Sequence, residues 1–261
     1  MDDGEIRHRL TVGEGEAARE IAVIAAPGRG PTIVWLGGFV SDMTGSKAEA
    51  VAAHARAGGR AVVRFDYSGH GASGGDFEKG TIGRWFEEAA AVIDAFAPGP
   101  VILVGSSMGG WIALLVARLL ARRGDGARLA GLVLIAPAPD FTEALMWPAF
   151  TGEMRRQILE EGRTRRPSDY GEGIVITRAL IEDGRDHLLL GGPIDVACPV
   201  HILQGCEDAD VPWRHALALT ECLPQGDVVL TLVKDGDHRL SRPQDIDRLL
   251  SAIEAMASRA T

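Results

Sequence analysis

The sequence lacks the features that mark a secreted or membrane-embedded protein. It contains only three cysteines, Cys198, Cys206 and Cys222, and this odd number without metal-ligand spacing indicates neither a disulfide framework nor a zinc site. The N-terminal stretch MDDGEIRHRL is acidic and has no apolar signal core, and no apolar run is long enough to cross a membrane. We therefore expect a cytoplasmic protein without a membrane span, in which the three thiols only pack.

Basic residues are fewer than acidic ones, 27 against 36. The formal net charge is −9 at pH 7, which argues against nucleic acid as a partner. The chain shows no internal repeat and no low-complexity tract. Of its 261 residues, 46% are hydrophobic and 24% are charged, a balance typical of a globular protein with a large core, built as one large α/β domain or two small ones. Nothing in the composition indicates an oligomeric state.

Apolar strands alternate with helices along most of the chain. We predict strands at 5–12, 19–26, 32–36, 60–66, 101–104, 129–136, 199–203 and 227–233, and helices at 45–57, 81–96, 110–122, 212–223 and 243–256. This alternation predicts a mostly parallel central sheet with an antiparallel start and helices on both faces. Residues 140–195 interrupt the alternation, and we interpret them as a cap inserted into a core domain formed by 1–139 and 196–261.

The stretch VILVGSSMGGWIALL, residues 101–115, contains a G-x-S-x-G pattern between a strand and a helix. This context is typical of a nucleophile elbow, a tight strand-to-helix turn that holds its central serine above the sheet. Small residues are required two positions away on each side, and Gly105 and Gly109 satisfy this requirement for Ser107. Ser106 lacks glycines at both offsets. We predict Ser107 as the nucleophile, while an ordinary glycine turn with incidental serines is the alternative.

A serine nucleophile needs a histidine base, and an acid must orient that histidine. In such a sheet the expected chain order is serine, acid, histidine. Asp208 and His238 have this order, and both follow a predicted strand. Glu207 is a weaker alternative for the acid, and Asp140, after the strand at 129–136, is the other possible acid. The remaining histidines are less suitable as the base because they fall in predicted strands, in helices, in the cap or in a glycine loop: His8, His54, His70, His187, His201 and His215.

Two backbone N–H groups are expected to form an oxyanion hole. One belongs to Met108, which follows the nucleophile, and the other to Phe39, in the loop after the strand at 32–36. The alternative for Phe39 is a plain strand-to-helix turn. The glycine loop at 69–73 lacks both the lysine of a phosphate-binding loop and the complete dinucleotide pattern, so no nucleotide and no other cofactor is predicted.

Two features of the predicted cap bear on substrate binding. The apolar stretch at 145–150 either walls an acyl pocket or attaches the cap to the core. Five arginines follow, interleaved with glutamates, and we interpret them as a solvated helix face with i,i+4 ion pairs; they are Arg155, Arg156, Arg163, Arg165 and Arg166. One or two of them could instead recognise a carboxylate of the substrate.

These residues resemble the α/β-hydrolase superfamily over nearly the whole chain. Asp66 to Ser73 matches its D-x-x-G-x-G-x-S loop. Within the superfamily the chain is similar to the family of mitochondrial palmitoyl-protein thioesterases and mycophenolic acid acyl-glucuronide esterases. The segments that carry this similarity are SDM at 41–43, RFDYSG at 64–69, LVGSS at 103–107, GGW at 109–111, VPW at 211–213 and DHR at 237–239. The resemblance implies an α/β-hydrolase fold and Ser107, Asp208 and His238 as nucleophile, acid and base.

Together these observations predict a serine hydrolase that cleaves ester or thioester bonds of hydrophobic acyl groups. The reaction would use an acyl-enzyme intermediate, no cofactor and no metal, and a small-molecule or acylated substrate. A C–C bond hydrolase or an acyltransferase would use the same three residues and differ in acceptor and pocket. A non-catalytic ligand receptor on the same fold is the alternative from another class, although a receptor does not need all three residues.

Overall fold

The computed structural model describes residues 4–168, 171–224 and 226–259. Its main sheet has eight strands in the order β1-β2-β4-β3-β5-β6-β9-β10. Their bounds are Ile6–Val12 for β1, Arg19–Ala26 for β2, Arg29–Leu36 for β3, Arg60–Phe65 for β4, Val101–Ser106 for β5, Leu129–Ile135 for β6, Val200–Gly205 for β9 and Val228–Val233 for β10. Strand β2 pairs antiparallel with β1 and β4, and the other neighbours pair in parallel. The predicted mostly parallel sheet with an antiparallel start is confirmed.

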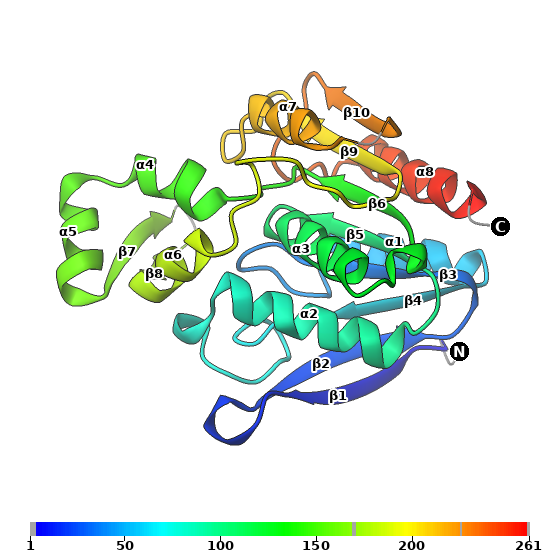
Figure 1. Ribbon diagram of the computed structural model, residues 1–261, viewed down its shortest axis with the longest axis horizontal. Helices are drawn as coiled ribbons and strands as arrows, with labels where there is room; N and C mark the ends of the chain where they lie inside the picture. Colours follow the sequence, from blue (N-terminus) through cyan, green and yellow to red (C-terminus); the bar gives the residue numbers. More distant parts are fainter. Residues whose placement is uncertain (1–3, 169–170, 225, 260–261) are drawn as a thin grey trace.

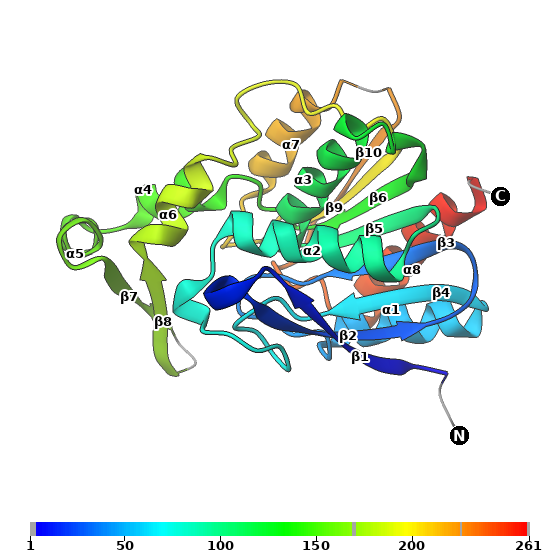
Figure 2. The ribbon, with the colours of Figure 1, turned by 60° about the horizontal axis from the view of Figure 1, so that its bottom comes forward.

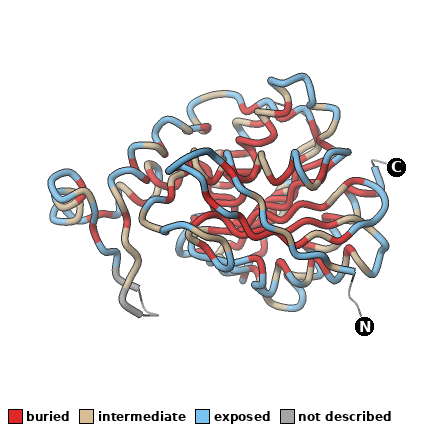
Figure 3. The backbone as a smooth tube through the Cα atoms, turned by 90° about the horizontal axis from the view of Figure 1, so that it is seen from below, coloured by how far each residue is buried: buried red, intermediate tan, exposed pale blue. Residues whose placement is uncertain are grey.

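Five long helices cover the two faces of this sheet (Figures 1 and 2). Their bounds are Ser46–Ala57 for α1, Ile82–Phe96 for α2, Met108–Arg122 for α3, Trp213–Cys222 for α7 and Pro243–Arg259 for α8. One buried apolar cluster joins the sheet to α2, α3 and α7, and a second joins it to α1 and α8. Because both faces are covered, the central strands are apolar at nearly every position, and all six residues of β5 are buried (Figure 3).

The short turns of the core are 3-10 helices at Gly15–Ala17, Phe77–Lys79 and Gly126–Arg128. The loop that contains Gly69 and Gly71 is held by Asp66, whose carboxylate accepts hydrogen bonds from the N–H groups of Met43 and Ala72, each at 2.7 Å. A Cβ on Gly71 would lie 2.1 Å from an oxygen of Asp66, so glycine is required there by packing. The glycines of this loop therefore serve the core structure.

The segment between β6 and β9 projects beyond one end of the core (Figure 1). It contains a π-helix, Thr142–Met146, the helices α4, Trp147–Ala149, α5, Gly152–Glu161, and α6, Arg178–Arg185, and a two-stranded antiparallel sheet of β7, Arg163–Ser168, and β8, Gly171–Thr177. The prediction of one helix face for the five arginines is wrong in part. Only Arg155 and Arg156 lie on α5, whereas Arg163, Arg165 and Arg166 lie on β7, where pairing with β8 replaces the helical hydrogen bonds.

Candidate active site

The turn between β5 and α3 holds Ser107 in a backbone conformation that side chains rarely adopt, with φ of 54° and ψ of −116°. Both flanking glycines are required by the packing. A Cβ on Gly105 would lie 2.4 Å from the carbonyl oxygen of Gly109, and a Cβ on Gly109 would lie 2.1 Å from the carbonyl oxygen of Leu36. Ser107 therefore keeps this strained conformation because the surrounding backbone leaves no space for another one. It leaves the Ser107 hydroxyl free to meet groups from other strands.

Three side chains from three strand ends form one hydrogen-bonded series. His238, in the loop after β10, lies with Nε2 3.1 Å from Oγ of Ser107 and with Nδ1 2.8 Å from Oδ2 of Asp208, in the loop after β9. Because the carboxylate accepts the Nδ1 proton, the lone pair of Nε2 faces the serine hydroxyl. The Asp208 side chain is fully buried, while that of His238 is 25% exposed. The imidazole of His238 can therefore reach both the serine and a molecule in the adjoining cavity.

The carboxylate of Asp208 is fixed by further hydrogen bonds. Its Oδ1 accepts from the N–H groups of Asp210, at 2.9 Å, and Val211, at 2.8 Å, and its Oδ2 also accepts from Nε2 of Gln204 at 3.0 Å. These donors hold the carboxylate toward His238. Gln204 was not identified from the sequence. Its signal is a single polar residue near the end of an apolar strand, at a position that is fully buried.

The other predicted acids lie elsewhere. Both oxygens of Asp140 accept hydrogen bonds, from the N–H groups of Leu189 and Leu190, each at 2.8 Å. Asp140 therefore fastens the segment that returns from the 140–195 region to the core, and Glu207 is exposed. Among the described residues, neither of these acids forms a hydrogen bond or ion pair with His238.

The two predicted oxyanion donors belong to residues close to Ser107. Met108 is the first residue of α3, and Phe39 follows Gly38, at which a Cβ would lie 3.5 Å from Cβ of Ser107. Neither N–H donates a hydrogen bond to another of the described residues. Both groups therefore remain available to a negatively charged oxygen on a substrate.

His70 has a different place from the one expected. We expected it to face solvent, but its side chain is 5% exposed and lies among the rings of Tyr67, Phe77 and Trp85. Burial lowers the pKa of its imidazole. Its Nδ1 donates to the carbonyl oxygen of Ser68 and its Nε2 accepts from the N–H of Val40, each at 3.2 Å. The neutral ring therefore holds the residue that follows Phe39.

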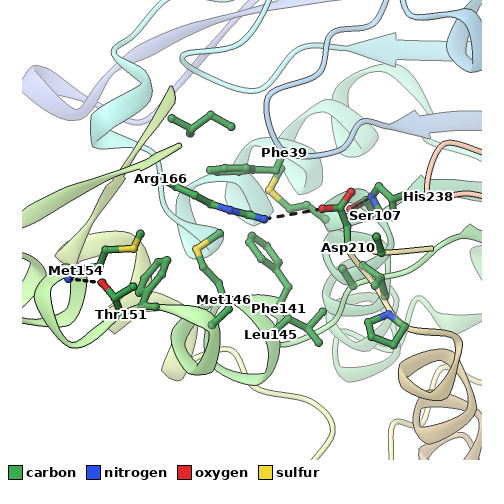
Figure 4. Close-up of a pocket in the computed structure, with 18 residues that line it drawn as sticks. Phe39, Ser107, Phe141, Leu145, Met146, Thr151, Met154, Arg166, Asp210 and His238 are labelled. Atoms are coloured by element: carbon green, nitrogen blue, oxygen red, sulfur yellow. Dashed lines mark hydrogen bonds and ion pairs between the residues drawn. The ribbon is translucent and has the colours of Figure 1, made fainter. Parts of the chain in front are cut away.

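A cavity of about 780 Å³ opens beside Ser107 (Figure 4). Its wall is mainly apolar and includes Phe39, Phe141, Leu145, Met146, Phe150 and Met154. The 145–150 stretch thus contributes to a pocket, as one of its two interpretations predicted. Arg166 of β7 extends across the cavity toward Asp210, with 3.9 Å between Nη2 and Oδ1.

One group of described side chains has the geometry to hold a metal ion. Ligand atoms of Asp208, Asp210 and His238 lie within 4.8 Å of one another. One hydrogen bond joins Asp208 to His238 and another runs from the N–H of Asp210 to Asp208, so these contacts already hold the three residues together. None of the described helices has both the length and the apolar character needed to cross a membrane.

Comparison with known proteins identifies the class. The alpha/beta hydrolase family model matches residues 23–249, and the chain belongs to this family. It is therefore an enzyme, a hydrolase. The mouse mitochondrial palmitoyl-protein thioesterase ABHD10 is 38% identical over 229 residues, which are 87% of this chain and 75% of that protein; the human protein of the same name is 35% identical over 229 residues, covering 87% and 73%. The predicted similarity to the thioesterase and acyl-glucuronide esterase family is confirmed for its thioesterase members.

Two solved structures extend this similarity to the whole fold. A crystal structure of an Agrobacterium vitis S4 protein matches with a TM-score of 0.94 and 55% identity, over 97% of this chain and 99% of that one. The structure of ABHD10 from mouse matches with a TM-score of 0.86 and 33% identity, over 97% and 100%.

The expectation of a cytoplasmic protein is contradicted by these relatives, which are mitochondrial proteins. The reasoning failed because cysteine usage separates oxidising from reducing compartments and does not separate one reducing compartment from another.

Proposed function

We propose that this hydrolase cleaves ester or thioester bonds of hydrophobic acyl groups through an acyl-enzyme intermediate. The observation that carries the proposal is the hydrogen-bonded series of Ser107, His238 and Asp208 at the edge of a largely apolar cavity. The named relatives favour acyl thioesters as the first substrates to test, because they are thioesterases.

The proposed reaction begins with attack of the Ser107 hydroxyl oxygen on the acyl carbonyl carbon. His238 Nε2 takes the serine proton, and Asp208 stabilises the imidazolium that forms. The N–H groups of Phe39 and Met108 bind the oxyanion, and each such donor typically contributes ~3 kcal/mol of barrier lowering. His238 then passes the proton to the leaving sulfur or oxygen as its bond to the acyl carbon breaks. Water, activated in the same way, releases the acid and restores Ser107.

Two cavity features support an acyl group as the part of the substrate that is retained. Binding of an acyl chain against the apolar wall is favourable, because the methylene groups of the chain are removed from water. The wall also draws on two regions, since Phe39 comes from the loop after β3 and Met146 and Phe150 come from the 140–195 segment. We infer that this segment acts as a cap and that 1–139 with 196–261 forms the core domain.

The proposal is tested by intact mass measurement after incubation with a fluorophosphonate, which reacts only with an activated serine. The parent protein is expected to gain one adduct, and Ser107→Ala is expected to gain none. Ser106→Ala is the matched control, because it removes the neighbouring hydroxyl and should label like the parent. Absence of an adduct on folded parent protein, or labelling that depends on Ser106, would contradict the proposal.

A further inference from the structure

A second cavity, of about 400 Å³, meets the first at the candidate catalytic residues. Both are lined by Phe39, Ser107 and His238, but from there they extend along different parts of the chain. The first extends under the 140–195 segment. The second extends along the loop between β3 and α1, the first turn of α1, and the loop that follows His238. The serine hydroxyl therefore lies where two cavities of different walls join.

The wall of the second cavity mixes apolar and polar groups and carries two cations. Lys47 and Arg239 both line it, together with five serine hydroxyl groups, that of Ser107 included, and a single carboxylate, that of Asp42. That carboxylate is already engaged, because it accepts hydrogen bonds from the N–H of Thr44 at 2.7 Å and from its hydroxyl at 2.5 Å. The charge that this wall offers to a ligand is therefore positive.

The two cations differ in their surroundings. Lys47 donates to the backbone carbonyl of Arg239, and burial lowers the pKa of its ammonium group to about 8, opposed by the nearby charge of Asp237. Arg239 is exposed, and its guanidinium makes no hydrogen bond or ion pair with any of the described residues. An anion in this cavity would offset the desolvation of Lys47 and give Arg239 a partner.

The chemistry of the proposed reaction assigns a part of the substrate to each cavity. The carbonyl carbon attacked by Ser107 has an acyl chain on one side and the leaving group on the other. The apolar cavity suits the acyl chain, and the leaving group must lie where Nε2 of His238 can protonate it. His238 also lines the second cavity, so that cavity is left for the leaving group.

We infer that the second cavity is a leaving-group site and that it selects thioesters or esters whose leaving thiol or alcohol carries a phosphate group, bound by Lys47 and Arg239. The inference rests on the proposed function. A phosphate monoester carries a charge of about −1.5 to −2 at pH 7, which matches two cations better than a neutral or singly charged group does. The phosphate leaves unchanged: only the acyl carbon–sulfur or carbon–oxygen bond breaks, and the proton from Ser107 goes to the leaving atom.

The experiment uses two thioesters that differ by one phosphate, S-octanoyl-pantetheine and S-octanoyl-4′-phosphopantetheine. The parent enzyme is expected to show a kcat/KM at least ~10-fold higher for the phosphorylated substrate, the scale of one to two charge-assisted hydrogen bonds. Arg239→Gln is expected to reduce that ratio to below ~3-fold. Arg122→Gln is the matched control, because Arg122 is an exposed arginine at the far end of α3 from Ser107, and it should keep the parental ratio.

The possible results distinguish failure of this inference from failure of the proposed function. Failure to hydrolyse either thioester, with no fluorophosphonate adduct, would contradict the proposed function itself. Equal kcat/KM for the two thioesters in an active enzyme, or a phosphate preference that survives in Arg239→Gln, would overturn the leaving-group site. S-octanoyl-N-acetylcysteine and S-octanoyl-N-acetylcysteamine differ by one carboxylate, and a preference for the carboxylate as large as that for the phosphate would overturn the phosphate assignment.

Product binding gives a second readout that does not depend on turnover of a thioester. With p-nitrophenyl octanoate as substrate, 4′-phosphopantetheine is expected to inhibit the parent enzyme ~10-fold more strongly than pantetheine does. In Arg239→Gln the two inhibition constants should converge. Equal inhibition of the parent by both compounds would also overturn the inference.

Discussion

Replacing His70 by phenylalanine provides a direct test of how the loop beside Ser107 is held. The ring of His70 is buried among aromatic side chains, so phenylalanine retains the packing of a ring there. The substitution removes one interaction above all, the hydrogen bond that Nε2 accepts from the N–H of Val40 at 3.2 Å. Val40 has a φ of 57°, in the left-handed region that a β-branched residue adopts only when its surroundings impose it.

The expected effect follows from two magnitudes. Loss of the hydrogen bond to the half-exposed Val40 costs ~0.5–1.5 kcal/mol, and the left-handed Val40 stores ~1–3 kcal/mol that a relaxed loop would release. In His70→Phe, the lost hydrogen bond and the strain at Val40 both favour a shift of the backbone next to the Phe39 N–H. Complete loss of that donor would lower kcat by roughly 100-fold. The Phe39 ring still packs on Phe77 and Phe141, so we expect His70→Phe to lower kcat by ~10- to 100-fold.

The assay is steady-state hydrolysis of an acyl thioester, together with the affinity for an alkyl boronic acid, which mimics the tetrahedral intermediate. Loss of an oxyanion donor should lower kcat and weaken boronate binding in parallel, with KM little changed. His70→Gln is the matched variant, because its amide oxygen can still accept from Val40, and it should recover most of the rate. A kcat for folded His70→Phe within twofold of the parent, or a rate for His70→Gln as low as that of His70→Phe, would refute the reasoning.

Three further predictions concern other parts of the molecule. Asp140→Ala should lower the free energy of unfolding, measured with urea, by ~3 kcal/mol, because two N–H groups lose a charged acceptor; a loss below ~1 kcal/mol would contradict the role given to Asp140. Among p-nitrophenyl esters, kcat/KM should rise up to ~4-fold per added methylene until the cavity is full, since each buried methylene contributes ~0.8 kcal/mol, and a flat series would exclude the cavity as the acyl site. The phosphate preference in kcat/KM should decline as pH rises through about 8, the lowered pKa of Lys47, because the deprotonated amine carries no charge; a preference constant from pH 7 to 9 would exclude Lys47 as the phosphate ligand.

The parts of the fold and site that the sequence predicts well are those set by local rules. The requirement for Gly105 and Gly109 is a steric property of one turn, and it can be identified from five letters and the flanking apolar strand. Asp208 and His238 could be proposed because parallel strands bring their carboxyl ends to one edge of the sheet. In each case the physical constraint acts on residues near in sequence or on the topology as a whole.

The parts that escaped prediction depend on how loops fold back in three dimensions. His70 holds Val40 across 30 residues of chain, and Gln204, although only four residues before Asp208, reaches it only because the loop after β9 turns back beside the end of that strand. The arginines of β7 were predicted to lie on a helix face, because they carry no alternating apolar pattern and β7 pairs only with β8 among the described strands. Charged residues reveal a strand only when one of its faces is buried.

The loop of Gly38, Phe39 and Val40 lies between the two cavities, beside Ser107. The side chain of Phe39 packs on Phe141 in the wall of the apolar cavity, while Gly38 and Val40 line the second cavity. If the Phe39 N–H also binds the oxyanion, any movement of this loop alters acyl binding, leaving-group binding and transition-state stabilisation together. Of these two cavities, Arg239 lines only the second. Substitutions in the loop should therefore change kcat for every substrate, whereas substitution of Arg239 should change the ratio between substrates that differ in their leaving group.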